Sequence, residues 1–219
     1  MQALDIRDLG TDVDYAATVA LQESLLAERV AGKIPDTLLL LEHKPVFTLG
    51  RSARAANVLW SEAELARRGI ACVATTRGGD VTYHGTGQLV GYPIVHLGAA
   101  RMTLTEYVHG VEETLLRALA TFGITGERNA RNHGVWIGGD KIAAIGLRVS
   151  RQVSMHGFSL NVTTRLEDCR GIVACGLRDA GVTSMAQVLG QAPAMADVKS
   201  AVLLSFCEVF GCHMGLLEK

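Results

Sequence analysis

The chain has 219 residues, of which 48% are hydrophobic and 20% are charged. This composition is typical of a compact globular protein and excludes a disordered or fibrous chain. The 21 Lys and Arg residues nearly balance the 22 Asp and Glu residues, so the formal net charge is −1. No overall electrostatic field therefore draws the protein to nucleic acid or to a membrane. We predict a single domain over residues 1–219.

The N-terminal sequence MQALDIRDLG lacks the features of a signal peptide, because it carries acidic residues where a basic segment and an apolar core are needed. No uninterrupted apolar stretch approaches the length of a membrane span. The five cysteines are an odd number without paired spacing, which favours free thiols over a disulfide framework. We therefore expect a cytoplasmic protein.

Helix and strand patterns alternate through the first part of the chain. The patterns predict, in chain order, a helix from Thr11 or Asp12 to Gly32, a buried strand from Thr37 to His43, a helix from Ser61 to Gly69 and a strand over residues 70–76. Ser61 followed by Glu64 is the signature of a capping box, and the glycines mark helix ends.

Four glycines, Gly78, Gly79, Gly85 and Gly87, lie in RGGDVTYHGTGQ, just before a buried strand predicted from Leu89 to Leu97. Glycine lets a backbone turn with positive φ or approach a ligand closely. Two interpretations remain open from these residues alone: two ordinary turns of a β-rich protein, or a ligand-binding loop mounted on a rigid strand.

The second half continues the mixture. It predicts a helix from Thr103, with a capping box to Glu106, as far as Gly123; a hairpin and a third strand over residues 133–162, joined at GGD and near Arg151 and Gln152; and a tail helix from Met195 to Gly211. Because strands and helices interleave without strict βαβ alternation, we predict an α+β fold of mixed β-sheets with flanking helices, rather than a doubly wound parallel sheet.

Cys175 is the cysteine best placed to act as a nucleophile, because Gly176 and Gly181, which follow it, indicate irregular backbone before a short helix near Thr183. A small buried side chain is the alternative. Cys169 lies six positions earlier and could form a redox pair with it, although such pairs use a closer spacing. Core roles are expected for Cys72 and Cys207.

Seven histidines raise the question of a metal site, but no H-x-x-x-H or C-x-x-C spacing occurs, and we predict no metal. Lys141 is more informative, because it begins the otherwise apolar strand KIAAIGLRV. A lysine there is either a solvent-facing strand end or a desolvated functional amine.

Four blocks taken in order, RGGDVTYHGTGQLVGYPIVHL, GDKIAAIGLRV, MHGFSLNV and IVACGL, resemble the signature blocks of the octanoyl-[acyl carrier protein]:protein N-octanoyltransferases of lipoate biosynthesis. The resemblance implies a fold shared with biotin and lipoate protein ligases, with an acyl-binding tunnel. It also implies an ATP-independent acyltransferase without a cofactor.

The resemblance implies a set of site residues. Cys175 matches the cysteine that carries the octanoyl group as a thioester, and Lys141 matches the lysine that lowers the pKa of that cysteine. The matched substrate-binding segments are Arg77, Gly78, Gly79, Asp80, Val81, Thr82, Tyr83 and His84; Ala144, Ile145 and Gly146; and Gly157, Phe158 and Ser159. The glycine-rich loop would then lie against the acyl chain, which favours the ligand-binding interpretation.

The implied donor is octanoyl-acyl carrier protein. The implied acceptors are lipoyl domains of 2-oxoacid dehydrogenase complexes and the glycine cleavage H protein, and neither nucleic acid nor membrane is a partner. Because the donor is acidic in that family, we expect basic side chains near Cys175, with Arg51, Arg54 and Arg148 as candidates.

The chain departs from the family pattern at Ala174, Thr86, Ala144, Phe158 and Ser159, without losing a reacting group. Two rival functions remain. One is an ATP-dependent lipoate or biotin ligase, although the chain lacks the longer R-R-x-S-G-G-G-type loop of lipoate ligases. The other is a non-catalytic binding module that kept the fold.

Overall fold

A computed structural model describes residues 2–130, 132–173 and 180–214 of the chain. The strands of its main sheet are β1 (Gln2–Asp8), β2 (Asp36–Leu41), β6 (Gln88–Ile94), β7 (Gly134–Ile137), β8 (Asp140–Ser150), β9 (Val153–Asn161), β10 (Gly181–Val182) and β11 (Cys212–Met214). Within the described residues these eight strands follow the order β10-β8-β9-β6-β2-β1-β11, with β7 paired to β8. β1 pairs with β2 in parallel, whereas β2, β6, β9 and β8 pair antiparallel in succession. The predicted mixed sheet is confirmed.

A second, smaller sheet contains β3 (Val46–Leu49), β4 (Ala71–Ala74) and β5 (Val81–His84), in the order β4-β3-β5. It has its own apolar cluster, which includes Phe47 and Val81. The sequence predicted β4 but not β3 or β5. β5 lies in the middle of the glycine-rich stretch, so that stretch is a loop, a strand and a turn that leads into β6.

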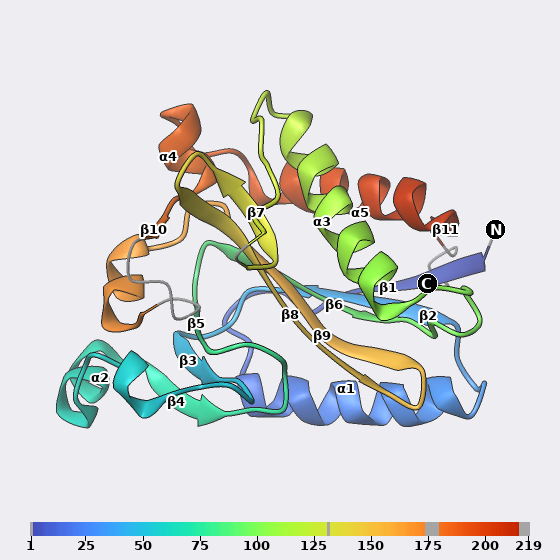
Figure 1. Ribbon diagram of the computed structural model, residues 1–219, viewed down its shortest axis with the longest axis horizontal. Coiled ribbons are helices and arrows are strands. Elements are labelled where there is room, and N and C mark those ends of the chain that lie inside the picture. Colours follow the sequence, from blue (N-terminus) through green and yellow to red (C-terminus); the bar gives the residue numbers. More distant parts are fainter. Residues whose placement is uncertain (1, 131, 174–179, 215–219) are drawn as a thin grey trace.

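The helices are α1 (Tyr15–Val30), α2 (Glu62–Arg68), α3 (Leu104–Ala120), α4 (Met185–Leu189) and α5 (Met195–Phe210), with short 3₁₀ helices at Ala55–Asn57 and Leu166–Gly171. α1 lies along one face of the main sheet, and α3 and α5 lie together on the other (Figure 1). No helix in the described part of the chain has the length and apolar character needed to cross a membrane.

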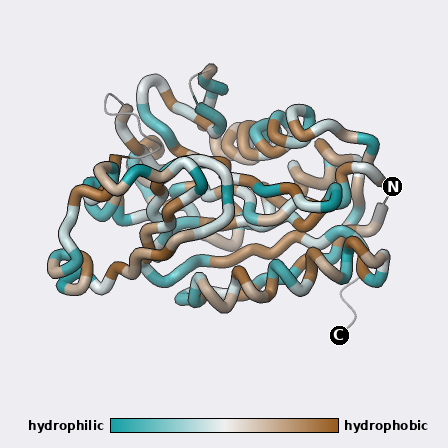
Figure 2. Tube along the Cα trace, turned by 60° about the horizontal axis from the view of Figure 1, so that its bottom comes forward, coloured by the Kyte–Doolittle hydropathy of each residue, from teal (hydrophilic) through white to brown (hydrophobic). Residues whose placement is uncertain are grey.

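The central strand β2 shows why the sheet needs helices on both faces. Leu38 and Leu40 pack into the cluster with α3 and α5, whereas Leu39 and Leu41 pack into the cluster with α1. Alternate side chains of a strand point to opposite faces, so a strand buried on both sides becomes a continuous apolar run. Hydrophobic stretches are accordingly concentrated in the inner strands (Figure 2).

Local signals in the sequence placed most helix ends correctly. Thr103 and Glu106 form the predicted reciprocal capping box of α3, and Gly69 and Gly211 end α2 and α5 in the left-handed conformation. The predicted start of α1 at Thr11 or Asp12 was wrong. Asp14 is the N-cap and accepts a hydrogen bond from the backbone N–H of Ala17 at 2.9 Å, because Val13 is held in an isolated bridge to His43.

The strand predictions differ from the structure mainly at their ends. β2 ends at Leu41 instead of His43, and β6 ends at Ile94 instead of Leu97. The predicted hairpin and third strand are confirmed: β7 and β8 pair across GGD, and β9 follows β8 at Arg151 and Gln152 and pairs with it antiparallel. Both of these residues have positive φ, 49° and 67°, as a tight hairpin turn requires.

Candidate active site

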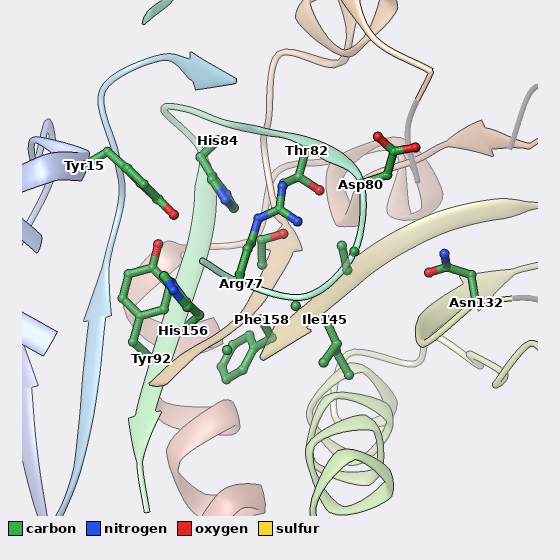
Figure 3. Close-up of a pocket in the computed structure, with 15 residues that line it drawn as sticks. Tyr15, Arg77, Asp80, Thr82, His84, Tyr92, Asn132, Ile145, His156 and Phe158 are labelled. Carbon is green, nitrogen blue, oxygen red and sulfur yellow. The ribbon is translucent and has the colours of Figure 1, made fainter. Parts of the chain in front are cut away.

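A pocket opens between the glycine-rich loop and the adjoining strands β8 and β9, and the predicted substrate-binding segments meet there. Its lining includes residues from all three segments, which are Arg77, Gly79, Asp80, Thr82 and His84; Ala144, Ile145 and Gly146; and Gly157, Phe158 and Ser159. The sequence did not single out Tyr15, Tyr92 and Asn132, which complete the lining with His156. Figure 3 shows the tyrosines at one end of the pocket and Asn132 at the opposite end.

Three residues of the predicted segments do not line this pocket. Val81 is fully buried in the core of the small sheet. Tyr83 lines an adjacent pocket, where Lys141 also lies. Gly78 lines a groove of about 450 Å³ on the α3 side of β8. This groove continues from the first pocket, because both are lined by Gly79, Asn132, Ile145 and Gly146.

The buried guanidinium of Arg77 holds the glycine-rich loop in place. It donates to the carbonyl and hydroxyl oxygens of Thr48 on β3, at 2.6 and 2.8 Å from Nη2, and to the carbonyl of Gly78 at 2.9 Å. The loop also donates a backbone hydrogen bond from Gly78 to the carbonyl of Leu147 on β8. The loop is therefore fixed between the two sheets.

His84 is fixed by a chain of amide hydrogen bonds. Asn161 donates from Nδ2 to the carbonyl of Thr183, which leaves its Oδ1 to accept from Nε2 of Gln88 at 2.9 Å. Nε2 of Gln88 also donates to the carbonyl of Tyr83. Oε1 of Gln88 must therefore accept from Nδ1 of His84 at 2.7 Å. Nε2 of His84 is then an unprotonated acceptor in a residue that lines the pocket.

Burial keeps the histidines of this region neutral. It lowers the pKa of His43 and that of His156 to about 4, and it lowers the pKa of His84 well below 6.5. His43 lies 2.8 Å from the Tyr92 hydroxyl, and Arg77 adds a positive charge that further lowers the pKa of His156. Neutral imidazoles can accept hydrogen bonds, so this end of the pocket is polar but uncharged apart from Arg77.

His156 has a strained backbone in the middle of β9, with φ of +57°. Its Nδ1 is buried and has no hydrogen-bond partner within the described part of the chain. A conformation of this kind in a non-glycine residue persists only where the surroundings impose it, and it is concentrated at functional sites. The sequence signal for His156 is weak, because only the glycine that follows it sets it apart.

Lys141 lies in the second pocket, which adjoins the first through Thr82, Ala144 and Ser159. The side chain is buried, with 6% exposure. Its Nζ donates to Oδ1 of Asn132 at 2.5 Å and to the carbonyl of His133 at 3.1 Å, and it lies 4.8 Å from the ring centroid of Trp136. Of the two interpretations of Lys141, the solvent-facing strand end is thus wrong, and the desolvated amine agrees with the structure.

Cys175 lies within residues 174–179, outside the described residues. The chain on either side of this segment is described. Val173 donates to the carbonyl of Asn57 at 2.8 Å, and after the segment Val182 pairs with Lys141 in parallel strands. Ile172 and Val182 both line the pocket in which Lys141 lies.

The described cysteines have different environments. Cys169 is buried, and desolvation followed by the nearby Asp168 carboxylate raises its pKa to about 12, so it remains a thiol at neutral pH. The predicted core role of Cys72 was wrong, because this residue is exposed on the edge strand β4. Cys207 is partly buried and packs against the main core.

Solved structures with a similar fold include protein ligases. A putative lipoate protein ligase from T. acidophilum, solved with bound lipoic acid, matches with a TM-score of 0.75 and 15% identity, over 98% of this chain and 88% of that chain. The biotin protein ligase of Aquifex aeolicus matches with a TM-score of 0.54 and 14% identity, over 96% of this chain and 69% of that chain. The predicted ligase-like α+β fold is confirmed.

The family is shown by the sequence itself. The model of the lipoyl protein ligase A/B catalytic domain matches residues 14–207, and the chain belongs to this family. Octanoyltransferases from Myxococcus xanthus, Alkaliphilus metalliredigens and Chloroflexus aggregans are 47%, 47% and 46% identical over 96%, 94% and 96% of this chain. The chain spans 60% of the Myxococcus relative and 95% and 96% of the other two. Within the family it is thus an enzyme of the octanoyltransferase group, the acyltransferases of lipoate biosynthesis.

Proposed function

We propose that this enzyme moves an octanoyl group from acyl carrier protein to a lysine of lipoyl domains through a thioester on Cys175. The acceptors would be the lipoyl domains of 2-oxoacid dehydrogenase complexes and the glycine cleavage H protein. Residues 1–219 would act as one octanoyltransferase domain. The observation that carries the proposal is the pairing of Val182 with Lys141 in neighbouring strands. Val182 follows Cys175 closely in the sequence, and it lies beside the residue that carries the buried amine.

The chemistry has two balanced steps. In the first, the Cys175 thiolate attacks the carbonyl carbon of the donor thioester, and the carrier leaves as its own thiolate. In the second, the amine of the acceptor lysine attacks the new thioester, loses a proton, and forms an amide as the Cys175 thiolate is released. Exchange between two thioesters is nearly isoenergetic, so neither ATP nor another cofactor is required.

Lys141 would stabilise the thiolate as an ammonium in the first step. As a neutral amine, it could accept the proton of the attacking lysine in the second. The donor's acyl chain would lie in the pocket formed by the glycine-rich loop, β8 and β9. Peptide N–H groups that face the reacting carbonyl would stabilise its oxyanion.

Cys169 provides a matched control for Cys175. Its raised pKa of about 12 makes it a poor nucleophile near neutral pH, although it lines the same pocket as Lys141. We therefore expect Cys169→Ser to keep the acyl adduct and most of the turnover. Cys175→Ser should abolish turnover, since a serine alkoxide is far harder to generate than a thiolate.

The test is incubation with octanoyl-acyl carrier protein without ATP, followed by mass spectrometry of the digested enzyme. An octanoyl group on the Cys175 peptide of the wild type and of Cys169→Ser supports the transferase. Labelling that needs ATP and free octanoic acid would show a ligase instead. No labelling under either condition would leave a binding module, and an adduct lost only in Cys169→Ser would reverse the assignment.

A further inference from the structure

We propose that Glu112 is a positioning residue for the reaction: through the turn at residues 132–134, this carboxylate fixes the ammonium group of Lys141 where it can act on Cys175. The inference rests on the proposed role of Lys141. It adds a residue of α3, on a different element from every predicted site residue.

Glu112 is an acidic side chain inside the protein. Only 3% of the side chain is exposed, and Glu112 lies among the buried residues of α3. Ionised carboxylates are rarely buried unless several partners compensate for the lost hydration. The partners of Glu112 therefore indicate what the group does.

These partners lie on one short turn and one arginine. Oε1 of Glu112 accepts from the backbone N–H of Gly134 and from Nδ1 of His133, each at 3.1 Å. Oε2 lies 3.3 Å from Nε of Arg128, which also pairs with Glu113. One carboxylate thus holds two consecutive residues of the turn from the α3 side.

The opposite side of the same turn holds Lys141. The carbonyl of His133 accepts from its Nζ at 3.1 Å, and Oδ1 of Asn132 accepts at 2.5 Å. His133 is therefore bonded to the carboxylate through its imidazole Nδ1 and to the ammonium through its backbone carbonyl. A shift of the turn away from α3 would move both oxygens that orient the amine.

Gly134 makes this arrangement possible. Its φ is +135°, and a Cβ at this position would collide with the carbonyl of Ala143 and stand 3.4 Å from Cε of Lys141. The turn therefore packs directly against the stem of the lysine. A residue with a Cβ could not keep this backbone position beside the Ala143 carbonyl and bring the N–H of position 134 to Glu112.

The experiment measures the reactivity of Cys175 with iodoacetamide between pH 5 and 9. Mass spectrometry of its peptide separates this reaction from that of Cys72, which is exposed. Lys141→Ala should slow alkylation at pH 7 by about tenfold, the effect of one unit in thiol pKa. The isosteric Glu112→Gln should slow it by about threefold to tenfold by the same route. Glu113→Gln, the next residue on the same helix, is the control and should change the rate less than about twofold.

A double-mutant cycle separates positioning from a general structural role. If Glu112 acts through Lys141, then adding Glu112→Gln to Lys141→Ala should produce no further slowing. Glu112→Gln with a normal pH profile, or with an effect that adds fully to that of Lys141→Ala, would overturn the inference even if the melting temperature falls. If Lys141→Ala itself leaves Cys175 unchanged, the proposed role of the lysine fails, and the positioning role fails with it.

Discussion

His84 and Gln88 are joined by a hydrogen bond of 2.7 Å between the imidazole Nδ1 and the amide Oε1. The direction of this bond is set by the other end of the amide, which donates to Tyr83 and Asn161. A neutral imidazole with its Nε2 unprotonated results. Burial reinforces this state by holding the pKa of His84 well below its usual value.

Gln88→Glu should raise the pKa of His84, because a carboxylate at the amide position stabilises a protonated imidazole. The wild-type ring should remain neutral across the range from pH 7 to pH 5, whereas the ring in the variant should titrate at a higher pH. NMR signals of the histidine ring, followed against pH, report this directly. Gln187→Glu on the exposed face of α4 is the matched control, and identical His84 titrations in both variants would show that the amide does not set the tautomer.

Acid should weaken the fold before the carboxylates titrate. The unfolded chain takes up protons on His43 and His156 near pH 6.5, but burial lowers the pKa of each to about 4 in the folded protein. Their contribution to stability is therefore present above pH 6.5 and is lost as the pH falls toward 4. The free energy of unfolding should fall by up to about 1.4 kcal/mol per pH unit for each histidine.

Urea unfolding at pH 6.5 and pH 5 measures this loss. In His43→Gln, the free energy of unfolding should fall less between pH 6.5 and pH 5, because only His156 of the two histidines still contributes to the loss. His109→Gln, on the exposed face of α3, serves as the control. Equal pH dependence in His43→Gln and the wild type would mean that His43 is protonated in the folded protein at pH 5.

Local chemistry explains which parts of the fold could be predicted. The capping box of Thr103 and Glu106 lies within one helical turn, and the hairpin at Arg151 joins neighbouring strands, so both are visible as short patterns. The pairing of β1 with β11 brings Gln2 beside Cys212. No local pattern specifies a contact between the two ends of a chain.

The same limit applies to the site. The glycine-rich loop and Lys141 were visible in the sequence, because glycines and a charged residue stand out beside apolar strands, but the residues alone left their roles open. Tyr15 and Tyr92 look like ordinary core residues in sequence and meet only when α1 packs on β6. Glu112 looked like one of several polar residues of a helix, since its partners at His133 and Gly134 lie in another segment.

Reversing the charge of Arg51 and Arg54 should slow association with an acidic acyl carrier. Both side chains are exposed, and their segment reaches the chain before Cys175 through the hydrogen bond from Val173 to Asn57. Arg148 should contribute less, because it is partly buried and donates to Oγ1 of Thr76. Surface charges of this kind act on the association rate and on its salt dependence.

Stopped-flow measurement of the association rate at several salt concentrations tests this. The double variant Arg51→Glu/Arg54→Glu should associate about tenfold more slowly at low salt and respond less to added salt. Lys33→Glu, exposed just beyond the end of α1, is the control. If both variants keep the wild-type rate and salt response, the two arginines are ordinary solvated charges.

Gly157→Ala should weaken both the fold and the transfer reaction. A Cβ at Gly157 would collide with the carbonyl of Gly91 and lie 2.6 Å from Cδ of Pro93, so β6 and β9 would have to separate. Overpacking of this kind costs about 1–3 kcal/mol, which lowers the melting temperature of a chain of this size by about 2–12 °C. Because Phe158 and Ser159 line the pocket on the same strand, turnover should fall in the same variant.

Gly139→Ala is the matched control, since a Cβ there meets nothing within 4 Å. If thermal melts and turnover of the two variants coincide, the close approach of β6 and β9 at Gly157 has no part in shaping the pocket.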